Sequence, residues 1–280
     1  DLMIMTMPDL NQYQVKRSKH HVHYIYIQHA LMSMHMAYRH GAFDWYDTIF
    51  CSGPHHVKEL RNLEKKYNLP RKKLFEHGYS RLDRIIEGNS LIEECSDKLS
   101  HALFAPSWGE NAVIESGLGP KIIEKLLTMG YSVTLRPHPE TWKSSAKHLK
   151  KIIKRYSNNI MFNYDQNVGF LDSFHNSDFM ISDWSGAALE YSFGLSKPVI
   201  FIDLPKKINN PNYTDIDDIP LEVSLRNEIG LVSKIDDLTD LLISSLTSKK
   251  IDASKYFFNI GESDKVGAKY IIKLSQEIKS

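Results

Sequence analysis

Short apolar runs alternate with helix-like segments along the N-terminal third of the chain. Apolar and β-branched or aromatic residues dominate at residues 2–5, 23–27, 48–51 and 74–76. Between the last two runs, residues 55–67 carry apolar side chains at helical spacing with charged residues between them. Runs of four or five such residues bounded by Gly, Pro and Ser are typical of strands. The pattern therefore predicts four strands, with one amphipathic helix between the third and the fourth.

The same alternation resumes beyond residue 100. It predicts strands at 102–105, 131–136, 160–162, 179–181 and 198–202, and helices at 121–129, 187–193, 235–246 and 265–278. Residues 209–220 are polar and are predicted to form a long loop. Short apolar strands that alternate with helices are typical of parallel sheets covered on both faces. The fold class that we predict is α/β, with two Rossmann-like lobes.

A polar stretch at residues 87–100 separates the two alternating regions and is the predicted linker. The chain of 280 residues is long enough for two α/β lobes. We place an N-terminal lobe at 1–95 and a C-terminal lobe at 96–260. We expect a final helix at 261–280 that packs back on the N-terminal lobe. The chain opens with Asp1 and runs directly into an apolar segment, which suggests an internal start and a truncated N-terminal lobe.

Composition narrows the class of protein. Hydrophobic residues make up 42% and charged residues 25%, which is enough for a sizeable core. The 35 Lys and Arg nearly balance the 34 Asp and Glu, which argues against a dedicated nucleic-acid-binding protein. Cys51 and Cys95 are far apart, so a disulfide scaffold is excluded and a cytoplasmic location is expected. No apolar run approaches the ~20 residues of a membrane-spanning helix.

A group of basic residues precedes the second predicted strand. It consists of Lys16, Arg17 and Lys19, with His20 and His21 beside them. Such a group can attach a protein to an anionic membrane surface, at about 1 kcal/mol for each basic residue near that surface. The alternative is a solvated loop with no partner, and the sequence leaves both open.

Polar loops follow several of the predicted strands. In open parallel sheets, ligands bind beyond the carboxyl ends of the strands. Pro106, Ser107 and Trp108 follow one strand, and the segments 136–139 and 183–186 follow two others. Because parallel strands end at the same edge of a sheet, these three loops are candidates for one binding site.

The segment 183–186 stands where a strand gives way to a helix. Backbone N–H groups at a helix start suit a phosphate, Ser185 adds a hydroxyl, and Gly186 allows close approach. The alternative is that Ser185 or Asp183 only caps the helix. Arg136 offers a fixed fork of donors for phosphate oxygens, with a structural ion pair as its alternative.

Two histidines are candidates for proton transfer or phosphate binding. His138 is stiffened by prolines on both sides, and His29 directly follows a predicted strand. A general base needs such a fixed mounting, although a structural role is open for each. The sequence contains no HExxH pair, and no P-loop or GxGxxG follows a strand. We therefore expect no metal site, no Walker NTPase and no standard NAD enzyme.

Taken together, these segments resemble the CDP-glycerol glycerophosphotransferase family, which includes teichoic-acid and capsule-polymer enzymes. Residues 78–83 (GYSRLD) are similar to the family's GYPRxD, residues 103–108 (LFAPSW) to its LYAPTW, and residues 136–139 (RPHP) match its RPHP. Residues 183–186 (DWSG) resemble its DYSS core, with Glu190 at the acidic position that follows. The chain departs from the family where Ala30 follows His29, where Gly186 replaces Ser and where Glu190 replaces Asp.

The resemblance implies a GT-B fold with the active site in the cleft between two Rossmann-like lobes. It implies transfer of glycerol phosphate from CDP-glycerol, or a related CDP-polyol, to a hydroxyl of a lipid-linked or glycan acceptor, with release of CMP. No metal or other cofactor is expected, and the protein would work in the cytoplasm or at the inner face of the cell membrane. By this resemblance His29 is the base on the acceptor, and His138 is a second catalytic residue. The implied diphosphate ligands are Arg136, His138, Ser185 and Gly186, and the implied nucleotide and glycerol pocket is Pro106, Ser107, Trp108, Asp183 and Glu190.

Two other functions remain open at this point. The same loops fit any nucleotide-diphosphate donor, so the chain could be a GT-B glycosyltransferase that uses a nucleotide-sugar. It could also be a non-catalytic lobe that binds nucleotide or glycan, which the Ala30 departure favours. A released nucleoside monophosphate indicates phosphodiester formation, and a released diphosphate indicates sugar transfer.

Overall fold

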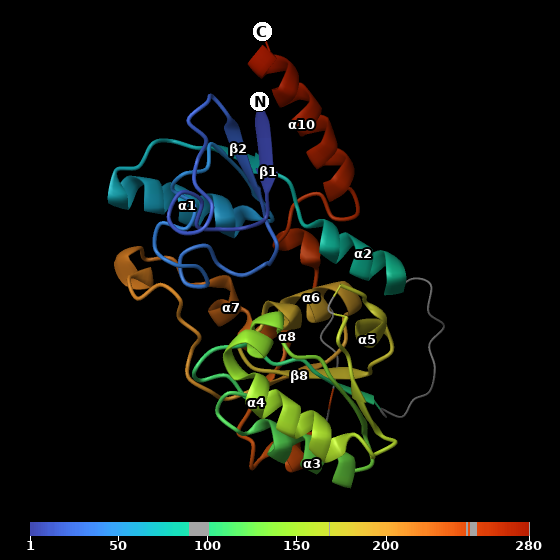
Figure 1. The fold of residues 1–280 in the computed structure, drawn as a ribbon. Helices are drawn as coiled ribbons and strands as arrows, with labels where there is room; N and C mark the ends of the chain where they lie inside the picture. Colours follow the sequence, from blue (N-terminus) through green and yellow to red (C-terminus); the bar gives the residue numbers. More distant parts are fainter. Residues whose placement is uncertain (90–100, 168, 245, 247–250, 280) are drawn as a thin grey trace. The chain divides into compact units, whose positions relative to one another are not determined.

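The chain forms two compact units, each built on a parallel sheet (Figure 1). The computed structural model describes residues 1–89, 101–167, 169–244, 246 and 251–279. The first unit contains Asp1–Arg84, Ile208–Val223 and Asp252–Ser280, and the second contains Ile85–Lys207 and Ser224–Ile251. Residues 208–223 and 252–260 thus belong to the first unit, whereas the sequence pattern placed them in the second. Most of the predicted linker, residues 90–100, lies outside the described residues.

The sheet of the first unit has four parallel strands in the order β1-β2-β3-β4. They are β1 (Leu2–Met5), β2 (His23–Ile27), β3 (Thr48–Cys51) and β4 (Lys73–Glu76), and α1 (Pro54–Tyr67) connects β3 to β4. These strands coincide with the four apolar runs of the sequence to within one residue. Their shortness and their β-branched and aromatic residues explain the agreement.

Alternate residues of this sheet pack on opposite faces. Tyr24, Tyr26 and Ile49 join the core beneath α1, whereas Ile25 and Phe50 pack against the last helix, α10 (Ser263–Lys279). This alternation follows from the two-residue period of a strand. Both faces of the sheet are therefore covered within the first unit. The start of α10 is joined to α2 (Ser80–Asn89) by hydrogen bonds that Asp83 accepts from the Gly261 and Ser263 amides.

The sheet of the second unit has six parallel strands in the order β10-β9-β8-β5-β6-β7. The chain enters at β5, moves outward through β6 and β7, and then returns to β8 on the other side of β5. The strand order therefore reverses between β5 and β8, which makes their carboxyl ends the topological switch point. The strands are β5 (His101–Phe104), β6 (Ser132–Leu135), β7 (Phe162–Tyr164), β8 (Phe179–Ser182), β9 (Val199–Ile202) and β10 (Leu231–Ser233).

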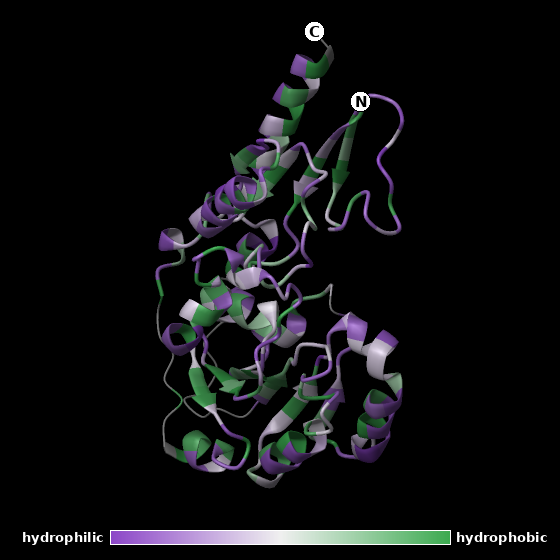
Figure 2. Cartoon of the chain, turned by 90° about the vertical axis from the view of Figure 1, so that its left-hand side faces the viewer, coloured by the Kyte–Doolittle hydropathy of each residue, from purple (hydrophilic) through white to green (hydrophobic). Residues whose placement is uncertain are grey.

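Helices cover both faces of this second sheet (Figure 1). One face packs against α3 (Gly119–Thr128), α4 (Pro139–Tyr156) and α9 (Leu238–Ser244) in one continuous core. The other face carries α6 (Gly186–Leu195), with α5 (Asp172–His175) packed against it through Phe174 and Tyr191. Hydrophobic residues predominate in the strands, while the outer helices are mixed (Figure 2). The remaining short helices are α7 (Leu221–Ser224), α8 (Arg226–Ile229) and the 3₁₀ turns at Tyr213–Asp215 and Ala253–Lys255.

The sequence pattern did not predict α4, a helix of 18 residues. The prolines on either side of His138 suggested a rigid loop. In the structure Pro139 occupies the first helical position, where its missing N–H costs nothing, and the His138 ring accepts a hydrogen bond from the Glu140 amide. The strand β10, with three residues, was also missed because its apolar run is too short to detect.

The segment from Ile208 to Val223 is fastened to the first unit through buried charged groups. The Glu222 carboxylate accepts hydrogen bonds from the Ser33 amide (2.9 Å) and hydroxyl (2.8 Å). His35 lies between the Asp218 carbonyl, 3.1 Å from its Nε2, and the Glu59 carboxylate, 3.1 Å from its Nδ1. Glu59 belongs to α1, so this histidine joins α1, the loop after β2 and the segment 208–223.

The stability that His35 contributes to the first unit should fall as pH rises above about 6.5, the ordinary pKa of histidine. Burial acts to lower the pKa of His35, but the hydrogen bond and charge of Glu59 outweigh it and raise that pKa. Burial also raises the pKa of Glu222. Both groups bind protons more tightly when folded, so their contribution is present below the unfolded pKa and lost above the folded one.

Thermal melts between pH 6 and pH 9 test this expectation. The melting temperature of His35→Gln should lie below that of the wild type at pH 6, and this difference should shrink between pH 6 and pH 9. His21→Gln, at an exposed histidine of the same unit, is the control and should follow the wild type. Equal slopes for His35→Gln and the wild type would contradict the role assigned to His35.

Candidate active site

The Asp183 carboxylate joins the two loops at the switch point of the second unit. Its Oδ1 accepts hydrogen bonds from the amides of Ser107 (2.6 Å) and Trp184 (2.7 Å), and its Oδ2 accepts one from Val113 (3.1 Å). The side chain is fully buried. Because the carboxylate faces backbone amides, Asp183 positions the loop after β5 relative to the loop after β8. The sequence placed Asp183 in the nucleotide pocket and did not predict this positioning role.

Arg226 supports the same loops from α8. Its guanidinium donates to the carbonyls of Asp183 (2.7 Å), just after β8, and of Ile202 (2.9 Å), the last residue of β9, and lies 4.0 Å from the centre of the Trp184 ring. Burial lowers the pKa of Arg226 to about 10, which leaves it charged at neutral pH. Arg226 was not a predicted site residue, because its sequence neighbourhood contains no motif.

Two helices begin beside this switch point. Ser185 caps α6 by accepting a hydrogen bond from the Ala187 amide (3.3 Å), and His138 caps α4 through Nδ1, which accepts from the Glu140 amide (3.1 Å). The strands that lead into these helices, β8 and β6, lie on either side of β5. A helix start presents partial positive charge and backbone donors. Two such starts at one edge of the sheet favour a bound anion.

The Trp108 side chain connects this edge to two further polar groups. Its ring lies 5.8 Å from the His138 ring, centre to centre, and the Nζ of Lys207 lies 4.1 Å above its face. Because Nδ1 of His138 accepts a hydrogen bond, the neutral ring carries its proton on Nε2. That nitrogen is then a donor, which suits binding a phosphate oxygen.

Arg136 points away from this group of residues. Its buried Nη1 lies 3.4 Å from the Asp165 carboxylate and donates to the Phe170 carbonyl (3.0 Å) and the Ser173 hydroxyl (2.5 Å). Its guanidinium also lies 4.8 Å from the centre of the Phe174 ring. The side chain thus joins β6 to the segment around α5, which is the structural alternative that the sequence left open.

The structure brings together part of the predicted donor site. The loops that meet at the switch point carry Ser107, Trp108, His138, Asp183, Ser185 and Gly186. Pro106 is buried just before Ser107, and Glu190 is buried in the middle of α6. Lys207 was not predicted, because it lies at the start of a polar loop and outside every motif.

His29 belongs to the first unit, at the end of β2, and its side chain is exposed. Its Nδ1 lies 2.9 Å from the Tyr26 hydroxyl, and the Tyr79 hydroxyl donates to its carbonyl at 2.9 Å. The Tyr38 ring meets it edge-on at 5.6 Å. Burial raises the pKa of Tyr26 well above its ordinary value, so this hydroxyl is neutral. These tyrosines give His29 a fixed mounting.

The segment 78–83 explains part of that mounting. Gly78 has φ +95°, and a Cβ there would lie 2.4 Å from the Phe258 carbonyl, so only glycine fits. Tyr79 follows and bonds to His29, and Asp83 binds the amides of Gly261 and Ser263 before α10. Of these three residues, Tyr79 holds the backbone at His29, while Gly78 and Asp83 hold the chain against the segment that leads into α10.

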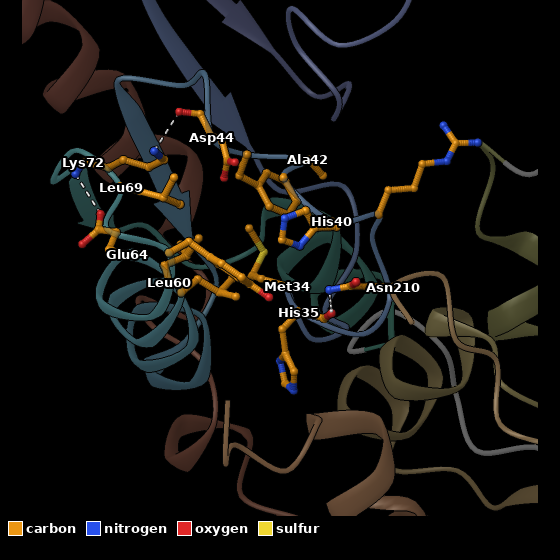
Figure 3. Close-up of a pocket in the computed structure, with 15 residues that line it drawn as sticks. Met34, His35, His40, Ala42, Asp44, Leu60, Glu64, Leu69, Lys72 and Asn210 are labelled. Atoms are coloured by element: carbon orange, nitrogen blue, oxygen red, sulfur yellow. Dashed lines mark hydrogen bonds between the residues drawn. The ribbon is translucent and has the colours of Figure 1, made fainter. Parts of the chain in front are cut away.

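A small cavity lies between α1 and the loop after β2 (Figure 3). Its walls include Met34, His40, Ala42 and Leu60. The cavity holds about 20 Å³, which is room for about one water molecule. It is therefore too small for glycerol or a sugar.

No group of three or more His, Cys, Asp or Glu side chains among the described residues has an arrangement that could hold a metal ion. No described helix has the length and apolarity needed to cross a bilayer.

Comparison with known proteins gives a family and a fold. Residues 3–257 match the sequence model of the CDP-glycerol:poly(glycerophosphate) glycerophosphotransferase family. No curated protein sequence matches the chain. The fold class is GT-B, as predicted, and solved UDP-GlcNAc 2-epimerases share it.

The similar structures include three proteins that were determined with nucleotides bound. The MnaA protein of S. aureus, solved with UDP, is 11% identical with a TM-score of 0.55, over 90% of this chain and 69% of that one. The epimerase of Methanocaldococcus jannaschii, solved with UDP-GlcNAc and UDP, is 13% identical with a TM-score of 0.52, over 90% and 69%. The Neisseria meningitidis epimerase, solved with UDP-GlcNAc, is also 13% identical with a TM-score of 0.52, over 90% and 70%.

Asp183→Asn should destabilise the second unit by about 2 to 3 kcal/mol, the cost of leaving buried donors unpaired. An amide keeps one acceptor oxygen but points an NH₂ group at a backbone N–H. Urea unfolding of the variant measures the loss. The exposed Asp237→Asn is the matched control and should stay within about 0.5 kcal/mol of the wild type. An Asp183→Asn variant as stable as the wild type would show that these hydrogen bonds do not hold the loops.

Proposed function

Because the chain belongs to the CDP-glycerol:poly(glycerophosphate) glycerophosphotransferase family, we propose that it transfers glycerol phosphate from CDP-glycerol to a hydroxyl group. The acceptor in this proposal is a lipid-linked or glycan molecule, and a related CDP-polyol is an alternative donor. The observation that carries the proposal is the pair of helix starts, α4 and α6, beside His138 and Trp108 at the switch point. This arrangement suits a diphosphate next to a flat ring system.

In the proposed reaction the acceptor oxygen attacks the phosphorus that carries glycerol. A new P–O bond forms, the bond between that phosphorus and the bridging oxygen breaks, and CMP leaves with the bonding electrons. The acceptor proton passes to a base. Negative charge builds up on the leaving phosphate, where the starts of α4 and α6 and the Nε2–H of His138 can stabilise it. We therefore assign His138 to donor binding, together with Ser185 and Gly186.

We assign the base to His29. The group that accepts the proton must be Nε2, because Nδ1 lies against Tyr26. Nδ1 must then carry a proton and donate it to the Tyr26 hydroxyl oxygen, which fixes the tautomer. The exposure of His29 suits contact with a large acceptor. In this assignment, Tyr26 orients the His29 ring through the hydrogen bond between its hydroxyl and Nδ1 of His29.

Attachment to an anionic membrane surface remains part of the proposal. Lys19, His20 and His21 are exposed, as such attachment requires. Arg17, however, pairs with Asp47 at 3.0 Å, and the Nζ of Lys16 donates to the Asn11 carbonyl at 3.3 Å. The charge of Arg17 is therefore compensated, whereas Lys16 keeps its charge beside a neutral carbonyl, and any membrane attraction through this loop should be weaker than the sequence suggested and salt-sensitive.

Product analysis tests the reaction. With CDP-glycerol and a hydroxyl-bearing acceptor, CMP should appear in step with glycerophosphorylated product, and EDTA should leave the rate unchanged. The helix starts and side chains supply the stabilising charge in this proposal, so no metal is needed. Release of a nucleoside diphosphate from UDP- or CDP-sugars would instead indicate glycosyl transfer. Loss of turnover in EDTA that magnesium restores would overturn the metal-independent mechanism.

His29→Ala should lower turnover by about 10²- to 10⁴-fold, the usual contribution of a general base, and leave the affinity for CDP-glycerol unchanged. Tyr26→Phe removes one neutral hydrogen bond and should lower turnover about fivefold. Tyr46→Phe is the matched control, because Tyr46 packs against Tyr26 while its hydroxyl bonds to the Met7 carbonyl. Steady-state rates and titration calorimetry measure both quantities. A folded His29→Ala variant with wild-type turnover would remove His29 from the mechanism.

A further inference from the structure

The proposed donor needs a cation that the family motif does not supply in this structure. A diphosphate carries negative charge that a GT-B site must neutralise with side chains and helix starts. The expected cation, Arg136, is paired with Asp165 and bonded to Ser173, so its charge is already compensated. Another positive side chain at the switch point of the second unit would supply that charge.

Lys207 is positioned for this role. It follows β9, the strand next to β8, and therefore comes from the same edge of the sheet as the loops that carry Trp108 and Ser185. Its Nζ lies 4.1 Å above the Trp108 ring, which has His138 as its other neighbour. In the described part of the chain, no hydrogen bond or ion pair to this ammonium group is found. The ring holds the lysine by a cation–π contact and leaves its three N–H donors for a ligand.

We propose that Lys207, held against Trp108, is the side-chain cation that binds the diphosphate of the nucleotide donor. The inference rests on the proposed function only in taking the ligand to be a nucleoside diphosphate or its ester. In this arrangement, Lys207 approaches the phosphates from the end of β9, and His138 and the start of α6 approach them from the ends of β6 and β8. The diphosphate thus takes the place of an ion-pair partner, which the described residues do not provide for Lys207.

The electrostatic state of Lys207 is consistent with this role. Burial lowers the pKa of Lys207 to about 8, although the carboxylates of Asp183, Glu115 and Glu140 act in the opposite direction. A partly buried ammonium without a paired anion is costly, and a diphosphate would relieve that cost. The free protein holds the charged form below about pH 8 and loses it above. Binding of CDP should therefore weaken about tenfold between pH 7 and pH 9.

Titration calorimetry with CDP tests the proposal on the full chain. At pH 7, Lys207→Met should bind CDP about 10- to 100-fold more weakly than the wild type, the cost of losing a charged hydrogen bond. Lys207→Arg should restore most of the affinity and keep it at pH 9, because guanidinium stays charged there. Lys206→Met, at the exposed neighbouring lysine, is the matched control and should bind CDP like the wild type.

Inorganic pyrophosphate at pH 7 separates this proposal from the proposed function. If the wild type binds pyrophosphate but not CDP, and Lys207→Met loses that binding, Lys207 is the anion-binding cation and the CDP donor is wrong. If the wild type binds CDP and a folded Lys207→Met binds it equally well, the Lys207 assignment is overturned while the donor class stands. If the wild type binds neither ligand, both proposals fail.

Discussion

The candidate donor site depends on one buried carboxylate. Asp183 accepts three backbone hydrogen bonds from two loops that are distant in sequence, and so fixes the end of β5 against the end of β8. Hydrogen bonds to a charged acceptor are about twice as strong as neutral ones, and a buried carboxylate without partners would be costly. The two loops must keep a fixed position relative to each other, because amides from both loops bind the same carboxylate. Trp108 and Ser185 directly follow Ser107 and Trp184, the residues whose amides bind this carboxylate.

Polar residues in the second unit divide into two groups. One group is bonded to the backbone of neighbouring loops: Asp183 to amides, Arg226 to carbonyls just after β8 and at the end of β9, and Arg136 to the Phe170 carbonyl. The other group, His138 and Lys207, lies around Trp108. A charged side chain is not by that fact part of the binding site, because Arg136, Arg226 and Asp183 have structural roles here. What distinguishes Lys207 from these three residues is that its charged group contacts an aromatic ring instead of buried backbone groups.

The sequence predicted much of the fold and less of the site. Strand positions were predicted well, because β-branched and aromatic runs bounded by turn residues are a local signal. The helix α4 was missed because Pro137 and Pro139 suggested a loop, and the return of residues 208–223 to the first unit depends on partners far away in sequence, such as Glu59 for His35. The direction in which the Arg136 side chain points and the contact between Lys207 and Trp108 likewise depend on residues that are distant in sequence. Neither follows from a motif.

This division also explains why the family-like segments contain so many residues that do no chemistry in the proposed reaction. Phosphoryl transfer depends on holding the reacting groups in line and stabilising charge, so the protein must fix loops accurately. Tyr79 holds the carbonyl of His29, and Asp83 holds the chain before α10. Tyr79 and Asp83 thus fix the backbone of the first unit through hydrogen bonds, as Asp183 fixes the loops of the second unit. A motif residue in such a protein is thus better understood as part of a mounting until a structure shows its side chain turned toward a ligand.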